Sequence, residues 1–167
     1  MEDVEPIVLS DYNRGYLEMA IDCEGNLSLT KDKSDTAKRG YTWRPRVMVT
    51  NTNLKLLEAL KDISGGLGKI ILSRGQKGNY KAVYYWYLRP SEQRVILPQL
   101  SLTIKEEQRI LLLDALLLLE ENRYSSSRSS KNDAGLEQIY LDLKKLNGKG
   151  VHQSYLPFIG KRRCKER

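Results

Sequence analysis

The sequence predicts an α+β fold in which two β-hairpins join into one antiparallel sheet and helices cover one face of that sheet. Apolar residues recur at helical spacing over residues 12–25, whereas polar and apolar residues alternate over 26–32 and 41–50. Two more runs rich in β-branched and aromatic residues, 69–74 and 80–89, indicate a second hairpin. A sheet with one apolar face must bury that face, so helices are expected to cover it.

The segment 12–25, YNRGYLEMAIDCEG, is expected to be a helix that ends at Gly25. Its apolar side chains fall on two neighbouring flanks, with Leu17, Ala20 and Ile21 on one and Tyr16, Met19 and Cys23 on the other. Such a helix needs two apolar partners. Glu24 lies in the last turn, where unpaired carbonyls and the helix dipole disfavour a negative charge. A cation is therefore expected close to the end of this helix.

The first predicted hairpin has one polar, basic face and one apolar face. The residues of the polar face are Asn26, Ser28, Thr30 and Asp32 from one strand and Thr42, Arg44, Arg46, Met48 and Thr50 from the other. Pro45 interrupts the second strand, which favours an edge or a bulge at that point. Residues 26–89 hold 13 basic and four acidic side chains, so positive charge is concentrated on the hairpins and the segments that link them.

The second predicted hairpin turns at GQKGN, and its tip carries Arg74, Lys77 and Lys81. Both of its faces are rich in aromatic residues. One set, Lys81, Val83, Tyr85 and Tyr87, alternates with another, Tyr80, Ala82, Tyr84 and Trp86. Polarity does not decide which set faces a partner.

The remaining segments are expected to be mainly helical. Asparagine and threonine residues cap a helix over 51–63, and a short helix is expected over 91–100. Thr103 with Glu106 forms a capping box that opens a helix reaching about residue 121.

The whole chain, residues 1–167, is expected to form a single domain with its core at about 12–121. An additional C-terminal helix is expected at about 133–146, and residues 161–167 form a basic tail. The tail is interpreted as a solubilising end, although it would also suit contacts with phosphates.

The charge distribution favours a polyanionic partner. The formal net charge is +7, although residues 1–25 hold seven acidic side chains and one basic one. The rest of the chain is therefore strongly basic, which suits nucleic acid but also fits a ribosome-associated protein or a merely soluble surface.

The rarity of cysteine and histidine argues against several kinds of site. Cys23 and Cys164 follow no disulfide or zinc-ligand spacing, and the only histidine, His152, has no obvious catalytic partner. The N-terminus is acidic, and the apolar run 110–119 is short and contains Asp114. We therefore expect an intracellular protein, in the cytoplasm or an organelle matrix, that is not secreted and has no membrane partner.

The stretch GYLEMAIDCEG resembles the signature helix of LAGLIDADG homing endonucleases. The matching positions, which include the first leucine, the isoleucine, both acidic residues and the final glycine, are Leu17, Ile21, Asp22, Glu24 and Gly25. The predicted order αββαββα and the VTNTN after the second strand are also similar to this family. The resemblance implies a saddle-shaped antiparallel sheet with helices on one face. A single motif resembles the homodimeric branch of the family.

The resemblance implies a site-specific DNA endonuclease of the intron-homing type, which binds a long pseudo-palindromic target as a homodimer and hydrolyses both strands with divalent metal. By motif position, Glu24 and the backbone carbonyl of Cys23 would hold Mg²⁺ or Mn²⁺. Lys105 resembles the family's active-site lysine, Asn51 the residue that positions solvent, and Lys55 a basic residue beside it. The plainer interpretations are a solvated helix end for Glu24, a surface lysine for Lys105 and a helix cap for Asn51.

The same resemblance assigns two further sets of residues. Contacts with double-stranded DNA are expected from Ser28, Thr30, Asp32, Lys33, Thr42, Arg44, Arg46, Met48, Lys69, Arg74, Lys77 and Lys81. The dimer interface is expected to contain Tyr16, Met19, Ala20 and Cys23. Two alternatives stay open on this scaffold: an intron maturase that binds structured intron RNA, and a DNA-binding protein without catalysis.

The chain departs from the family pattern where two signature helices would touch. Small residues are usual at that contact, whereas this chain has Met19 and Cys23, with Ala20 as the nearest small alternative. A wider or shifted helix crossing is then expected. Asp22 points away from Glu24 around the helix and is expected to be structural, with a bond at the partner helix.

Overall fold

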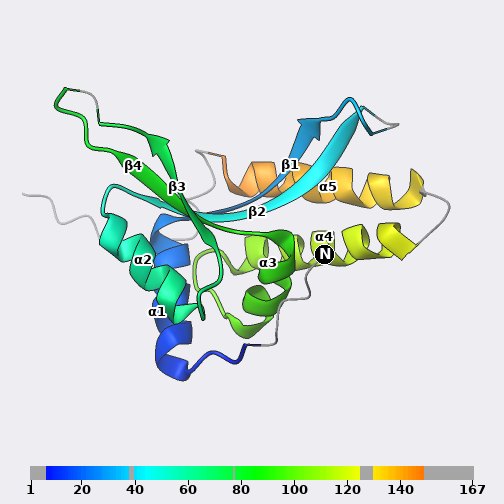
Figure 1. Ribbon diagram of the computed structural model, residues 1–167. Coiled ribbons are helices and arrows are strands. Elements are labelled where there is room, and N and C mark those ends of the chain that lie inside the picture. The colour runs from blue at the N-terminus through cyan, green and yellow to red at the C-terminus, as the bar shows by residue number, and fades with distance from the viewer. Residues whose placement is uncertain (1–6, 38–39, 77, 125–129, 149–167) are drawn as a thin grey trace, which may run out of the picture.

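The computed structural model describes residues 7–37, 40–76, 78–124 and 130–148. Their elements follow the predicted order of helix, hairpin, helix, hairpin and helices (Figure 1). The helices are α1 (Asp11–Glu24), α2 (Leu54–Ile63), α3 (Pro90–Ile96), α4 (Glu106–Tyr124) and α5 (Ser130–Leu146), and a short 3-10 helix, η1 (Leu97–Gln99), follows α3. The strands are β1 (Gly25–Lys33), β2 (Tyr41–Asn51), β3 (Lys69–Arg74) and β4 (Val83–Leu88). Lys77 and the basic tail lie outside the described residues.

The two hairpins form one antiparallel sheet with the strand order β1-β2-β4-β3. β2 joins the hairpins, because it pairs with β1 on one side and with β4 on the other. In Figure 1 the two hairpins rise toward opposite sides, so the sheet is curved and its face away from the helices is concave. The predicted α+β fold with helices on one face is confirmed.

A layer of helices covers the other face of the sheet (Figure 1). α1 and α2 contact β2, and α5 packs against α4 and β1. The fully buried side chains between these layers include Leu17 and Ile21 of α1, Leu27 of β1, Val47 of β2 and Trp86 of β4. Each such side chain contributes roughly 1.5–3 kcal/mol by leaving water, which fixes α1 beneath the sheet. No helix within the described ranges is long and apolar enough to cross a membrane.

The faces of the first hairpin are those that the alternation predicts. Leu27 and Leu29 of β1 are buried against the helices, so their neighbours Ser28 and Thr30 lie on the opposite, open face. Across the strand pair, the open face also carries their register partners, Arg46 and Arg44.

The structure decides which face of the second hairpin is open. Trp86 is fully buried, and its Nε1 donates to the carbonyl of Leu67 at 3.0 Å. Tyr85 and Tyr87, its neighbours in the strand, therefore lie on the open face. One row of side chains crosses all four strands on this face: Asn26, Met48, Tyr87 and Lys69.

Pro45 lies where β2 has a neighbouring strand on one side only. It pairs with Leu29 of β1, but β4 ends at Leu88, opposite Val47. Nε2 of the buried Gln93 donates to the carbonyls of Pro45 and Leu88 at 3.1 and 2.7 Å. α3 thus satisfies the backbone at this edge of the sheet.

Some predicted boundaries differ from the structure. Asn51 is the last residue of β2, so α2 begins at Leu54 and not at residue 51. α4 begins at Glu106 and not at Thr103. The reason is tertiary, because the backbone N–H of Thr103 donates to a carboxylate of α1 and the predicted local capping box does not form.

Candidate functional site

The end of α1 and the start of α4 hold each other by hydrogen bonds. The carboxylate of Asp22 accepts the backbone N–H groups of Thr103, Ile104 and Lys105 at 2.7, 3.2 and 3.0 Å. In return, Nζ of Lys105 donates to the carbonyl oxygens of Ile21 and Asp22 at 2.8 and 2.5 Å. Each helix terminus thus receives the charge that its dipole favours, negative at the start of α4 and positive at the end of α1.

Lys105 is the cation expected near the last turn of α1. Its side chain is only 8% exposed, which excludes the interpretation of an ordinary surface lysine. Burial lowers the pKa of its ammonium group below the usual 10.5, while Asp22, Cys23 and Glu24 act in the opposite direction. The site therefore holds a partly desolvated positive charge directly beneath the end of α1.

Glu24 and Cys23 are exposed in the last turn of α1. The chain passes from α1 directly into β1 at Gly25, whose N–H donates to the carbonyl of Ile21. A Cβ atom at Gly25 would lie 2.5 Å from that carbonyl oxygen, so a side chain does not fit there without a backbone shift. This tight junction keeps the Glu24 carboxylate at the surface, close enough for its charge to act on Lys105.

Asn51 lies near the same junction. Gly25 pairs with Val49, so Asn51 is two residues further along β2, past the end of β1. Its side-chain oxygen accepts the N–H of Asn53 at 2.9 Å and forms an Asx turn before α2. Lys55 is exposed in the first turn of α2. Among the described residues, the fold brings Glu24, Lys105 and Asn51 toward one end of α1, and Lys55 lies in the first turn of α2, the helix that follows Asn51.

The open face of the first hairpin carries a cluster of one acid and two arginines. Oδ2 of Asp32 lies 3.1 Å from Nη2 of Arg46 and 3.4 Å from Nε of Arg44. Tyr87 of β4 lies close enough that both arginines lower the pKa of its phenol, but burial outweighs them and raises that pKa above 10.0. The predicted polar face is therefore an organised set of charges.

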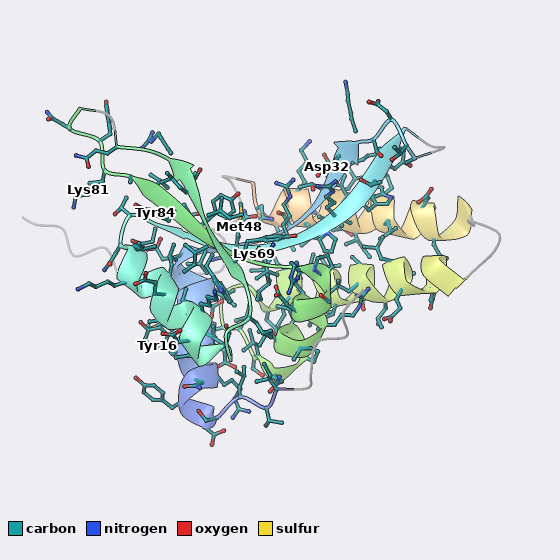
Figure 2. All side chains as sticks on the ribbon, in the orientation of Figure 1. Tyr16, Asp32, Met48, Lys69, Lys81 and Tyr84 are labelled. Atoms are coloured by element: carbon teal, nitrogen blue, oxygen red, sulfur yellow. The ribbon has the colours of Figure 1, made fainter. Side chains whose placement is uncertain are left out.

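The other predicted basic contacts lie toward the ends of the strands. Lys69 begins β3 and Arg74 ends β3. Lys33, which ends β1, alternates with the open-face Asp32 and pairs with Tyr41, so it lies on the helix side of the sheet and not on the face where we expected it. Lys81 lies in the exposed segment that precedes β4, toward the tip of the second hairpin (Figure 2). Figure 2 shows Asp32 and Lys81 toward opposite hairpin tips with Met48 between them. Positive charge on the concave face thus comes from Arg44 and Arg46 at the first hairpin and from these other basic residues at the second.

One side of α1 is apolar and exposed. Tyr12 is 77% exposed and Met19 is 56% exposed, and Cys23 is also exposed. With the half-buried Tyr16 they form a stripe at the 4-3-4 spacing that suits contact with a second helix. Ala20, which we expected at a helix contact, is 6% exposed and packs in the core of its own chain. No group of three or more metal-binding side chains occurs within the described part of a single chain.

No protein-family description and no curated protein matches this chain. Solved structures do match. The archaeal intron-encoded homing endonuclease I-Vdi141I, complexed with DNA, has a TM-score of 0.70 and 21% identity over 84% of this chain and 87% of that one. The LAGLIDADG homing endonuclease I-SmaMI, bound to cleaved DNA, has a TM-score of 0.60 and 24% identity over 88% of this chain and 46% of that one. The homing endonuclease I-CvuI, in complex with its target, has a TM-score of 0.62 and 15% identity, covering 84% and 88%.

This chain has the LAGLIDADG homing-endonuclease fold. The resemblance of residues 17–25 to the signature helix is thereby confirmed at the level of the fold, with α1 carrying residues 17–24 and Gly25 beginning β1. The chain spans most of I-Vdi141I and of I-CvuI but slightly less than half of I-SmaMI.

Two residues on the open face of this LAGLIDADG sheet could not be assigned from the sequence. The alternation already places Asn26 and Thr50 on the polar face with Ser28 and Met48, although neither is among the expected DNA contacts, and the register confirms that placement. Tyr85 and Tyr87 required the burial of Trp86, which the sequence does not show.

Proposed function

We propose that this chain is a site-specific, metal-dependent DNA endonuclease of the intron-homing type that acts as a homodimer. The observation that carries the proposal is an exposed carboxylate, Glu24, close enough to a buried ammonium group, Lys105, for its charge to act on it, at the end of a helix whose exposed stripe is apolar. Hydrolysis of a phosphodiester needs a metal ligand and positive charge at one place, and these two residues would supply them.

The residues at the end of α1 fit a hard divalent cation. The carboxylate of Glu24 is exposed, and the carbonyl of Cys23 belongs to the last turn, whose carbonyls lack partners within the helix. Lys105 binds the carbonyl oxygens of Ile21 and Asp22. The carboxylate of Glu24 and the carbonyl oxygen of Cys23 are thus left as ligands for Mg²⁺ or Mn²⁺. A bound divalent cation would neutralise phosphate charge and make a bound water more acidic.

The chain's own groups have separate roles in this proposal. Lys105, held by two carbonyls, presents a fixed positive charge where the phosphorane would develop negative charge. Asn51 orients a water molecule through its amide group, and Lys55, in the first turn of α2, adds positive charge. Because Asp22 holds the backbone of Lys105, it acts as a positioning residue.

The concave face of the sheet is proposed as the DNA-binding surface. Its side chains are polar and basic at the first hairpin and aromatic at the second, and lysines and arginines border it. Base edges would be read by the strand residues, whereas Lys69, Arg74 and Lys81 would contact phosphates. I-Vdi141I and I-CvuI, which share the fold, are complexed with DNA, and this supports the assignment.

Two copies of the chain would pair through the exposed stripe on α1. This arrangement brings two Glu24 residues together at the two-fold axis, one for each strand of a pseudo-palindromic duplex. The apolar character of Tyr12 and Met19 supports it, because exposed apolar stripes on a helix favour a second helix as partner.

Cleavage of duplex DNA tests the proposal. The substrate joins the sequences that flank the protein's reading frame, and the assay contains Mg²⁺. We expect the wild type to cut both strands and Glu24→Gln to lower the rate about 100-fold or more, with DNA affinity retained. Glu107→Gln, which removes an exposed carboxylate from α4, is the matched control and should cut normally.

The other outcomes would reject parts of the proposal. Unchanged cleavage by Glu24→Gln would reject the site. Tight binding of the duplex without cleavage would favour a DNA-binding protein, and binding of the intron RNA in place of the duplex would favour a maturase.

A further inference from the structure

We propose that Arg44 reads guanine in the bound DNA and that Asp32 positions Arg44 for this contact. The inference rests on the proposed DNA-binding function and adds to it the class of base that one arginine recognises. It is carried by the arrangement of Asp32, Arg44 and Arg46 on the open face of β1 and β2.

The carboxylate of Asp32 lies between two arginines of the neighbouring strand. Arg44 and Arg46 are two residues apart in β2, so their side chains emerge on the same face about 7 Å apart. Alone, two guanidinium groups at that spacing repel each other and stay mobile. Oδ1 and Oδ2 of Asp32 both accept from Nη2 of Arg46, at 3.5 and 3.1 Å, and Oδ2 also attracts Nε of Arg44 at 3.4 Å. The acid thus holds both guanidinium groups.

The two arginines are held in different ways. Asp32 engages Arg46 through Nη2, a terminal nitrogen, and the Arg46 side chain is 38% exposed. Asp32 engages Arg44 through Nε, and the Arg44 side chain is 65% exposed. Arg44 therefore keeps its two terminal Nη groups for a ligand in the concave space of the sheet, whereas Arg46 anchors the carboxylate.

Guanine is the base that fits the two terminal Nη groups of Arg44. In the major groove guanine offers two acceptors, O6 and N7, which match two parallel N–H groups of a guanidinium. Adenine offers one acceptor and one donor, and its amino group would face an arginine N–H. An arginine held in advance by a carboxylate loses less side-chain freedom on binding, which strengthens the contact and sharpens its selectivity.

Asp32 is assigned to positioning and not to direct contact with DNA. We had expected it among the DNA-contacting residues because it shares a face with Ser28 and Thr30. A carboxylate is repelled by phosphates and by the acceptor edge of guanine. Its side chain is 27% exposed, and both oxygens are already used by Arg46.

Selection from a random duplex library tests the inference. The full-length protein is incubated with the library in Ca²⁺, in the presence of which I-SmaMI is bound to uncleaved DNA. Bound duplexes are sequenced, and affinities are then measured for each single base-pair change in the best duplex. We expect one position in each half-site where guanine is preferred over adenine by roughly 5- to 150-fold.

Three variants separate the roles of the residues. Arg44→Lys keeps the charge but has no fork of two N–H groups, so it should lose the guanine preference at that position alone. Asp32→Asn should weaken the same preference several-fold. Asp35→Asn makes the same charge change at an exposed position of the same hairpin and should leave the preference intact.

Each of the other possible outcomes would overturn a defined part of the inference or the proposed function on which it rests. Failure of the wild type to enrich any sequence would reject the proposed function together with the inference. If the wild type enriches a sequence but Arg44→Lys weakens binding to all duplexes equally, Arg44 contacts a phosphate and not a base. That result would overturn the inference and leave the proposed function standing. A guanine preference that Asp32→Asn leaves unchanged would overturn the positioning role. Circular dichroism checks that each variant is folded. Arg44→Lys replaces a mostly exposed side chain, so we expect this variant to fold normally and its binding data to be interpretable.

Discussion

Asp22 and Lys105 cap each other's helices, although 83 residues separate them in the chain. The carboxylate of Asp22 binds the backbone that precedes α4, and the ammonium group of Lys105 binds the last carbonyls of α1. The proposed active-site lysine is therefore placed by the same helix that carries the proposed metal ligand, Glu24.

Asp22→Asn should destabilise the protein. Asparagine keeps one acceptor oxygen but loses the charge that three backbone N–H groups share, so the free energy of unfolding should fall by about 1–3 kcal/mol. Urea unfolding measures this change. Asp62→Asn, at an exposed position of α2, is the control and should change stability little. Equal stability of Asp22→Asn and the control would show that the mutual capping does not hold the helices.

The sequence predicts one half of this relationship and misses the other. The charge of Glu24 in the last turn indicates that a cation lies nearby, and Lys105 confirms it. We assigned Asp22 to a bond at the partner helix, whereas the structure shows it bound within its own chain. Local spacing cannot show which backbone, 83 residues away, receives a carboxylate.

The sheet illustrates the same limit. For the first hairpin, polar and apolar residues alternate, so the buried face follows from the sequence and Leu27 and Val47 are buried as predicted. For the second hairpin, both faces are aromatic. Which of these two faces is buried depends on Trp86, whose Nε1 donates to the carbonyl of Leu67 on the helix side. Only tertiary structure supplies that partner.

The pH dependence of cleavage should report on Lys105. Burial lowers the pKa of its ammonium group below 10.5, so the charge that cleavage uses is lost at a lower pH than for a free lysine. We expect the cleavage rate to fall about tenfold per pH unit above that pKa. In the same range the unfolded chain binds more protons than the folded one, so this group's contribution to stability rises with pH. Deprotonation of Lys105 in that range therefore does not itself destabilise the fold.

Lys105→Arg provides the comparison for that profile. A guanidinium group stays protonated, so the alkaline fall in rate should move to higher pH even if the maximal rate is reduced. Rates are measured in Mg²⁺ beside unfolding curves at each pH. If the cleavage rates of the wild type and of Lys105→Arg fall at the same alkaline pH, the decrease in rate comes from the titration of another group.

Glu106 should stabilise the start of α4 in a pH-dependent way. Its hydrogen bonds from Arg109, and from the backbone N–H of Leu102, lower the pKa of its carboxyl group below the usual 4.5. The stabilisation is fully present above that usual value and is lost as the pH falls through the lowered pKa. Glu106→Gln should therefore unfold at a lower urea concentration than the wild type at neutral pH, and the difference should shrink as the pH falls below 4.5 and through the lowered pKa. A difference that is independent of pH would reject this account.

Gly68→Ala should be far more destabilising than Gly66→Ala. Both glycines have positive φ, of 86° and 81°, so alanine at either position costs about 1–2 kcal/mol of backbone strain. At Gly68 a Cβ atom would lie 2.2 Å from Nε1 of Trp86, whereas at Gly66 it meets nothing within 4 Å. The clash would displace Trp86 from Leu67 and from the core, adding a few kcal/mol. Thermal unfolding of the two variants compares them, and equal losses would show that backbone strain alone matters.

Met19→Glu should abolish the proposed homodimer. Met19 is 56% exposed in the middle of the apolar stripe on α1, and two-fold symmetry would bring its charge close to its own copy in the partner helix. A buried pair of like charges is strongly unfavourable, so the variant should sediment as a monomer at micromolar concentration and should lose cleavage of both strands. Leu117→Glu places the same charge at a 60% exposed apolar position of α4 and is the matched control, which should remain dimeric and active.

Sedimentation is measured with and without DNA, because DNA can drive two weakly associating copies together. A wild type that stays monomeric in both conditions would remove the two-fold site, since Glu24 would then have no symmetry partner with which to act on the second strand.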